Sequence, residues 1–121
     1  MDKTKFSVFV NLSARVGSIT DNRLGGWISY RSSKAALNQI IKTSSIEINR
    51  RNKNAICVGL HPGTVKTSFT EKFQNTTETI SPDESVKMMM KVVENLSVDD
   101  NGYCFAYDGK VIPAWTLHSN F

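Results

Sequence analysis

Short apolar runs alternate along the chain with longer segments of helical periodicity. Residues 6–12 and 55–60 are apolar and rich in strand-forming side chains, which is typical of buried strands. Residues 27–51 lie between these runs and contain neither glycine nor proline. In that segment the apolar residues Ala36, Leu37, Ile40, Ile41 and Ile48 recur at roughly helical spacing. The pattern therefore predicts an amphipathic helix between two mostly buried strands.

A second helix is predicted over residues 82–96. Ser81 is a good N-cap, Pro82 suits the first helical position, and Glu84 completes a capping box. We expect the apolar face of this helix to consist of Val86, Met89, Met90 and Val93. A methionine stripe of this kind is more typical of a packed core than of a cofactor site.

The predicted elements follow one another as strand, helix, strand, helix, strand. The last strand comes from residues 102–115, where two short apolar runs flank Asp108-Gly109, a signal for a tight turn or hairpin. Residues 13–26 and 64–80 are expected to be loops. Buried strands that alternate with helices predict parallel βαβ units. We therefore expect an α/β fold that forms a single unit over residues 1–121.

The composition restricts the classes of function only slightly. The chain has 121 residues, of which 40% are hydrophobic and 21% charged, and its net charge is +4. Its densest basic cluster, Arg50-Arg51-Asn52-Lys53, lies at the predicted end of a helix, where cations complement the helix dipole. Aromatic and basic residues do not interleave as in nucleic-acid-binding proteins. We therefore expect neither a nucleic-acid partner nor, since no apolar run is long enough to span a bilayer, a membrane segment.

The two cysteines suggest a reducing environment. Cys57 and Cys104 are far apart in the sequence and form no CxxC pair. Cys57 lies inside an apolar run and is expected to be a buried thiol. Because nothing suggests a disulfide framework or a metal site, the expected location is cytoplasmic.

Tyr30 and Lys34 are the candidate chemical groups. A spacing of four places both side chains on one face of a helix, one turn apart. A nearby cation favours the phenolate form of a tyrosine, so such a pair can act as an acid/base unit. The same spacing also occurs by chance on solvated helices, and a plain surface pair is the alternative.

Four motifs follow one another along the chain: a strand end, a Tyr-x-x-x-Lys helix, a Pro-Gly turn and a closing strand. They are Val10-Asn11-Leu12-Ser13-Ala14-Arg15-Val16-Gly17, Tyr30-Arg31-Ser32-Ser33-Lys34-Ala35-Ala36-Leu37, His61-Pro62-Gly63-Thr64-Val65-Lys66-Thr67 and Ala106-Tyr107-Asp108-Gly109-Lys110-Val111-Ile112-Pro113-Ala114-Trp115. Together they resemble the carboxyl-terminal half of the short-chain dehydrogenase/reductase family. The resemblance is strongest to the branch of C-factor-like and sniffer-like carbonyl reductases.

This resemblance implies the second half of a Rossmann fold and an oxidoreductase that uses NAD or NADP. Tyr30 would exchange a proton with a carbonyl or alcohol substrate, and Lys34 would stabilise the phenolate and bind the nicotinamide ribose. Ser13 would hold the substrate oxygen. The remaining cofactor-binding residues implied by the family are Pro62, Gly63, Val65 and Thr67.

Two features of the chain depart from the family pattern. The family's catalytic serine is usually the second of two consecutive serines, and the aligned residue here is Ala14. Ser13 could replace it after a small shift, or could simply cap the strand end, and Ser18 lies in the same loop. The glycine-rich turn that approaches the cofactor pyrophosphate belongs to the family's amino-terminal half, which has no counterpart here. A helix-borne asparagine of the family's proton relay is also absent.

These departures leave two hypotheses. One is a truncated reductase that is inactive on its own, because most of its cofactor site is missing. The other is a non-catalytic module derived from the family, which pairs with a full-length relative or with itself. In that case the first strand would present an open edge that invites association.

Overall fold

The observed elements follow the predicted order. The computed structural model describes residues 4–19, 22–63 and 79–113. The elements are β1 (Ser7–Leu12), the 3-10 turn η1 (Arg15–Gly17), α1 (Ile28–Arg51), β2 (Ala55–His61), α2 (Pro82–Glu94), the 3-10 turn η3 (Val98–Asp100) and β3 (Cys104–Ala106). The prediction of a β-α-β-α-β arrangement is therefore confirmed.

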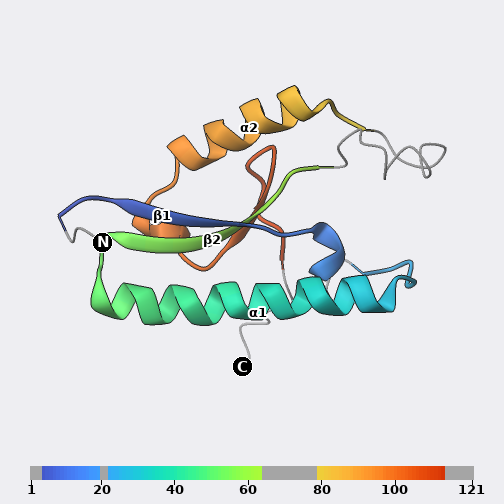
Figure 1. Ribbon diagram of the computed structural model, residues 1–121, viewed down its shortest axis with the longest axis horizontal. Helices are drawn as coiled ribbons and strands as arrows, with labels where there is room; N and C mark the ends of the chain where they lie inside the picture. Colours follow the sequence, from blue (N-terminus) through green and yellow to red (C-terminus); the bar gives the residue numbers. More distant parts are fainter. Residues whose placement is uncertain (1–3, 20–21, 64–78, 114–121) are drawn as a thin grey trace.

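The three strands form one parallel sheet between two helices. Their order is β1-β2-β3, with Ser7 opposite Ala55 and Gly59 opposite Cys104. Figure 1 shows α1 on one face of the sheet and α2 on the other. This layering brings the carboxyl ends of β1 and β2 to one edge of the sheet, close to the amino end of α1. In open α/β sheets, ligands bind at that edge.

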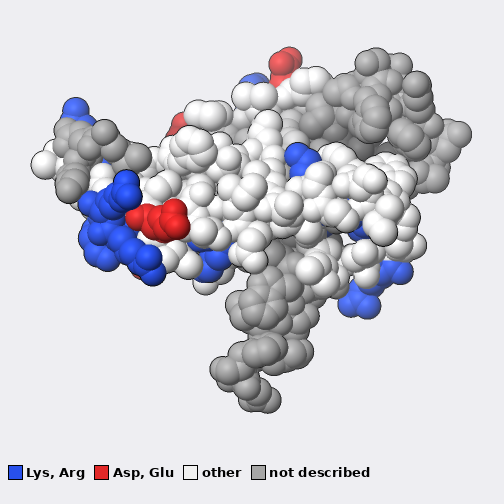
Figure 2. Space-filling model, turned by 60° about the horizontal axis from the view of Figure 1, so that its bottom comes forward, with Lys and Arg blue, Asp and Glu red and all other residues white. Residues whose placement is uncertain are grey.

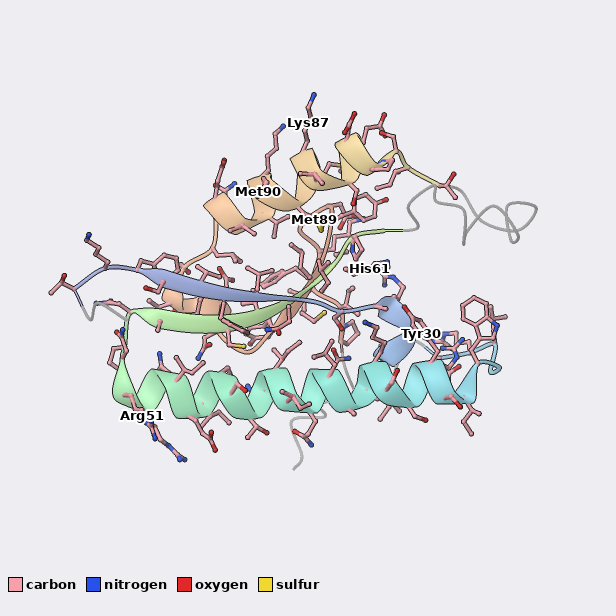
Figure 3. The ribbon with its side chains drawn as sticks, in the orientation of Figure 1. Tyr30, Arg51, His61, Lys87, Met89 and Met90 are labelled. Carbon is pink, nitrogen blue, oxygen red and sulfur yellow. The ribbon has the colours of Figure 1, made fainter. Side chains whose placement is uncertain are left out.

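The larger core lies between the sheet and α2. The buried side chains of Ile56, Val58, Leu60 and Phe105 form its centre. Around this centre pack Val8, Met89, Val92, Val93 and Leu96. The inner face of α2 therefore runs through positions 89, 92 and 93, and Leu96, just after the helix end, adds to the same core. Figure 3 shows α2 with Met89 and Met90 labelled.

Two residues predicted for the apolar face of α2 are exposed instead. Val86 and Met90 are both exposed, so the prediction is wrong at these positions. The helix carries apolar residues at positions 88–90, 92 and 93, and such a run permits more than one phase of packing against a sheet. The predicted helix start is confirmed, because the Ser81 side chain accepts a hydrogen bond from the Glu84 amide at 3.2 Å.

β1 is less buried than its sequence suggests. Phe9 and Leu12 are 59% and 58% exposed, and Val10 is also exposed, so the prediction of a mostly buried strand is wrong. β1 is an edge strand, since β2 is its only partner among the described residues. A strand of this composition is buried only when a further strand and its helices cover the second edge.

α1 packs against the sheet through a narrow face. Within it only Ile41 and Ser45 are fully buried. Ile40 is 60% exposed and Ala36 is also exposed, so the predicted apolar face was partly misassigned. Figure 2 turns α1 toward the reader and shows basic side chains gathered at its carboxyl end, where Arg50 and Arg51 occupy the last turn. This agrees with the predicted role of the basic cluster at the helix end.

The predicted turn at Asp108-Gly109 is confirmed as a short hairpin after β3. The Gly109 amide donates to the Ala106 carbonyl at 2.9 Å, and the Ala106 amide donates to the Lys110 carbonyl at 2.7 Å. Phe105 and Val111 form an antiparallel bridge that closes the hairpin. In the described part of the chain, no helix is both long and apolar enough to cross a bilayer.

Candidate active site

Tyr30 and Lys34 lie together near the amino end of α1. The Lys34 Nζ is 5.8 Å from the centre of the Tyr30 ring. The same Nζ lies 3.5 Å from the carbonyl oxygen of Leu12, at the end of β1. Tyr30 is 46% exposed, so a substrate can approach its ring. Figure 3 shows Tyr30 and His61 at the same end of the sheet. The helical spacing thus places a phenol and an ammonium side by side at a strand end.

Ser13 is fixed within the fold at the end of β1. Its amide donates to the Leu60 carbonyl at 2.9 Å, and its side chain is only 4% exposed. The Ser13 Oγ donates to Asn38 Oδ1 at 2.7 Å. Asn38 lies one turn beyond Lys34 on α1, so Tyr30, Lys34 and Asn38 follow one stripe of the helix. The Ser13 hydroxyl is therefore engaged by the helix that carries the candidate acid/base pair.

The other serine of this loop faces a different part of the molecule. Ser18 is fully buried, and its hydroxyl donates to the carbonyl oxygen of Pro113, beyond the β3 hairpin. It therefore attaches the loop to the carboxyl-terminal hairpin. Ala14, which aligns with the family's catalytic serine, is the residue that precedes η1.

Gly17 allows the loop after β1 to approach α1 closely. A Cβ added to Gly17 would lie 2.8 Å from the backbone carbonyl carbon of Lys34 and 2.9 Å from its Cβ. Only glycine permits this contact, which positions η1 against the turn of α1 that bears Lys34. The sequence showed Gly17 only as a loop glycine, and neither it nor Asn38 was predicted to support the site.

The Pro-Gly turn after β2 is held from α2. The buried hydroxyl of Ser85 donates to the Pro62 carbonyl at 2.6 Å. Gly63 has a φ of +83°, and a Cβ there would also lie 2.9 Å from Cδ1 of Tyr107. The turn thus requires glycine both for its backbone conformation and for space. Val65 and Thr67, two of the predicted cofactor-binding residues, lie outside the described residues.

His61 is a half-buried group that the sequence did not single out as functional. It is the last residue of β2, and its Nδ1 is buried without a hydrogen-bond partner among the described residues. Burial and, to a smaller extent, the charge of Arg15 lower the pKa of His61, whereas Asp108 raises it. The imidazole is therefore held toward its neutral form beside the candidate site.

The two cysteines do not supply a reactive thiolate. Both are free and buried, as predicted for Cys57. Burial raises the pKa of both thiols, and this outweighs the opposing influence of the Asn11 amide on the pKa of Cys57 and of Ser13 and Arg15 on that of Cys104. Raised thiol pKa values are typical of structural cysteines. Among the residues that the structure describes, no group of His, Cys, Asp or Glu could hold a metal ion.

The site fits the nicotinamide end of a dinucleotide cofactor. Lys34 presents a partly exposed ammonium at the end of β1. None of the seven glycines in the sequence belongs to a G-x-G-x-x-G motif, which in dinucleotide-binding folds approaches the pyrophosphate.

Comparisons with known proteins agree with this geometry. No family model matches the chain. An uncharacterized oxidoreductase of Schizosaccharomyces pombe is 37% identical over 124 aligned positions, which cover 92% of this chain and 47% of the relative. Carbonyl reductase Sniffer of D. melanogaster has a TM-score of 0.76 at 31% identity, covering 88% of this chain and 40% of that protein. An NADPH-bound carbonyl reductase from chicken fatty liver has a TM-score of 0.73 at 40% identity, covering 88% of this chain and 42% of that protein.

The chain spans about half the length of the curated relatives that it matches. Its parallel sheet is shared with the solved carbonyl reductases, which confirms the predicted fold class. The sequence motifs, the fold and these matches lead to one conclusion: this chain belongs to the short-chain dehydrogenase/reductase family, of which it represents the carboxyl-terminal half.

Proposed function

We propose that the chain supplies the catalytic half of an NAD(P)-dependent reductase that interconverts a carbonyl and an alcohol. The observation that carries the proposal is the position of the Lys34 ammonium, 5.8 Å from the centre of the Tyr30 ring at the carboxyl edge of a parallel sheet. The family relationship supports the same reaction type.

Tyr30 would act as the general acid in carbonyl reduction. Its hydroxyl would donate a proton to the substrate oxygen while the carbonyl carbon gains a hydride, so that a C–H and an O–H bond replace the C=O π bond. The nicotinamide cofactor supplies that hydride when it is bound. The Lys34 ammonium would stabilise the phenolate left on Tyr30. Because Tyr30 is half-exposed, water can return its proton.

Ser13 remains the predicted second hydrogen-bond donor for the substrate oxygen. A serine hydroxyl has a single proton, and that of Ser13 is donated to Asn38 Oδ1. Serving the substrate would require the hydroxyl to leave Asn38. With alanine at position 14, we therefore expect weaker stabilisation of the developing negative charge than in a relative that has a serine there.

Cofactor binding would need residues beyond those of this chain. Six residues of this chain would hold the nicotinamide side of the cofactor: Tyr30, Lys34, Pro62, Gly63, Val65 and Thr67. A glycine-rich turn from an amino-terminal half would hold the pyrophosphate. We therefore propose that the chain alone binds NADPH poorly and turns over little or no substrate. The free, buried cysteines support a reducing compartment such as the cytoplasm.

The isolated chain is tested first by titrating NADPH and measuring carbonyl reduction. Micromolar binding together with turnover would contradict the expected incompetence of this half. Catalytic competence is tested in a chimera that joins the amino-terminal half of the Schizosaccharomyces pombe relative to this chain. The chimera should oxidise NADPH with a carbonyl substrate.

The tyrosine offers a matched pair of variants. In the chimera, Tyr30→Phe should lower kcat by roughly 100-fold or more, because it removes the general acid and keeps the ring. Tyr103→Phe makes the same chemical change at an exposed tyrosine beside Phe105, and it should leave kcat unchanged. A folded, NADPH-binding chimera that reduces no carbonyl, or that is insensitive to Tyr30→Phe, would disprove the proposed activity.

A second candidate function is association without catalysis. The open edge of β1 carries the exposed side chains of Phe9 and Leu12, and α1 exposes Ile28, Ile40 and Ile46. These surfaces favour pairing with a second copy or with a full-length relative. Size-exclusion chromatography discriminates, since a clean monomer at high concentration would argue against self-association.

A further inference from the structure

We propose that Trp27 forms an aromatic wall beside Tyr30 that selects carbonyl substrates bearing an aromatic ring. This inference rests on the proposed reductase function, and it specifies the class of substrate for the same site. It starts from the loop between η1 and α1, which has no role in the acid/base chemistry described above.

The backbone around Trp27 has an unusual conformation. Gly25, Gly26 and Trp27 have φ angles of 68°, 77° and 55°, so three successive residues lie in the left-handed region. Trp27 is the only non-glycine residue with positive φ in the described part of the chain. Bulky L-residues rarely adopt this conformation, and they persist in it where the surrounding structure enforces it.

Hydrogen bonds fix this loop from α1 and from its own start. The Arg31 side chain donates through Nε to the Gly26 carbonyl at 2.8 Å and through Nη2 to the Gly25 carbonyl at 3.2 Å. Asn22 Oδ1 accepts from the Gly25 amide at 3.1 Å. The Trp27 carbonyl accepts the first helical hydrogen bond, from the Arg31 amide, at 2.8 Å. The backbone position of Trp27 is therefore set before any ligand arrives.

The indole lies against the candidate proton donor. The Trp27 and Tyr30 rings meet edge to face, with their centroids 6.2 Å apart and their planes at 73°. Trp27 is nevertheless 54% exposed, and Tyr30 is about half-exposed. A tryptophan that served only to pack Tyr30 would be expected to bury most of its ring. Much of the indole surface is thus available to a molecule whose oxygen reaches the Tyr30 hydroxyl.

The connection between β1 and α1 carries further apolar side chains. Ile19 and Leu24 belong to this connection, and both are strongly exposed. Exposed apolar side chains favour contact with an apolar ligand. An aromatic ring gains an additional quadrupole interaction with indole that a saturated ring of similar size lacks, and this favours it by roughly three- to tenfold.

Ligand binding by the whole chain tests the proposal without a cofactor. The probes are acetophenone and cyclohexyl methyl ketone, which share a methyl ketone and differ in the aromaticity of the ring. Affinities are measured by saturation-transfer NMR, and independently by quenching of Trp27 fluorescence in a Trp115→Phe background. We expect acetophenone to bind roughly three- to tenfold more tightly.

Variants of Trp27 separate the ring from the fold. The preference should persist in Trp27→Phe and disappear in Trp27→Ala. Trp27→Gly removes the ring and also suits the positive φ, so it keeps the test valid if the alanine variant unfolds. Tyr103→Ala removes an exposed aromatic ring elsewhere and should leave the preference intact.

Equal binding of the two ketones, or a preference that survives in Trp27→Gly, would overturn the aromatic wall. Two outcomes distinguish failure of the aromatic wall from failure of the proposed reductase function. A chimera that reduces both ketones with a kcat/KM ratio that Trp27→Gly leaves unchanged would retain the reductase activity and disprove the role of Trp27. A preference for acetophenone in binding, without reduction by a folded chimera, would support the wall and disprove the activity.

Discussion

The Ser13 Oγ and Asn38 Oδ1 lie 2.7 Å apart and connect the end of β1 to the face of α1 that carries Lys34. This hydrogen bond joins residues 25 positions apart in the sequence. On the same side of the helix, the Lys34 ammonium reaches toward the Leu12 carbonyl. The end of β1 and α1 are thus held together by side chains next to the candidate acid/base pair.

Removing the Ser13 hydroxyl should destabilise the fold. Ser13→Ala leaves Asn38 Oδ1 without this donor in a partly buried position, and we expect the free energy of unfolding to fall by about 1–2 kcal/mol. Urea denaturation measures the change. Ser33→Ala is the control, since Ser33 is exposed and its hydroxyl donates to the Tyr30 carbonyl within the same helix. Equal stability of the Ser13→Ala variant and the parent would contradict a structural role for this hydrogen bond.

Introducing a serine at position 14 should increase activity. Ala14→Ser places a hydroxyl where the family's catalytic serine aligns, and it leaves the Ser13–Asn38 hydrogen bond intact. Because a positioned donor stabilises the developing oxyanion, we expect kcat in the chimera to rise by roughly 10- to 100-fold. Ala36→Ser adds a hydroxyl to the exposed face of α1 and should change nothing. If Ala14→Ser leaves kcat unchanged, position 14 is not where this chain stabilises substrate.

Gly17→Ala should force the loop after β1 away from α1. The added Cβ would meet the backbone of Lys34 at 2.8 Å, and neither partner is a movable side-chain end. We expect a loss of about 1–3 kcal/mol in unfolding free energy and changed amide chemical shifts around Lys34. Gly109→Ala is the comparison, because among the described residues the nearest atom to its Cβ would be Val92 Cγ2 at 3.9 Å, while its φ is +89°. It should destabilise through backbone strain and leave the shifts around Lys34 unaltered.

The sequence predicted the parts of the fold that depend on local chemistry. The start of α2 depends on Ser81 and its neighbours, and the final hairpin on Asp108-Gly109, and both were correctly placed. The Tyr30–Lys34 contact follows from helical spacing alone. In each case the interacting residues lie within a few positions of one another, so the local sequence contains the information.

The misassigned positions depend on distant partners. Phe9 and Leu12 resemble residues of a buried strand, but burial of β1 depends on a neighbour that is not among the described residues. Met90 is exposed because contact with the sheet decides which face of α2 is buried. A run of consecutive apolar residues does not by itself determine that face. The position of Asn38 on the Tyr30–Lys34 face of the helix could have been predicted, since it lies four residues beyond Lys34. Its hydrogen-bond partner could not, because Ser13 lies on another element.

His61 should make stability depend on pH. Burial and Arg15 lower its pKa in the folded protein, whereas the unfolded chain has an ordinary value of about 6.5. Between these two values the unfolded state binds more protons, so the stabilisation is complete above about pH 6.5 and is lost as the pH falls further. His61→Gln should therefore flatten the decline in unfolding free energy between about pH 7 and pH 5.

Charge variants determine the sign of this effect independently. Arg15→Gln should raise the pKa of His61 toward its ordinary value and make the decline shallower. Asp108→Asn should lower the pKa further and make the decline steeper. His118 is present in every variant, so differences between their denaturation curves report on His61. The same slope in the parent and in His61→Gln would show that His61 does not contribute.

A charge on the open edge of β1 should reduce association. Phe9 is 59% exposed on a six-residue strand that pairs on one side only within the described chain, and such edges recruit further strands. Phe9→Lys places an ammonium there, where an incoming strand would have to desolvate it. Sedimentation of the parent should show self-association, and Phe9→Lys should weaken this association at least several-fold. Val111→Lys is the control at an exposed position on the β3 hairpin, and it should behave like the parent. If Val111→Lys weakens association and Phe9→Lys does not, the contact forms at the β3 side and the β1 edge is not the binding surface.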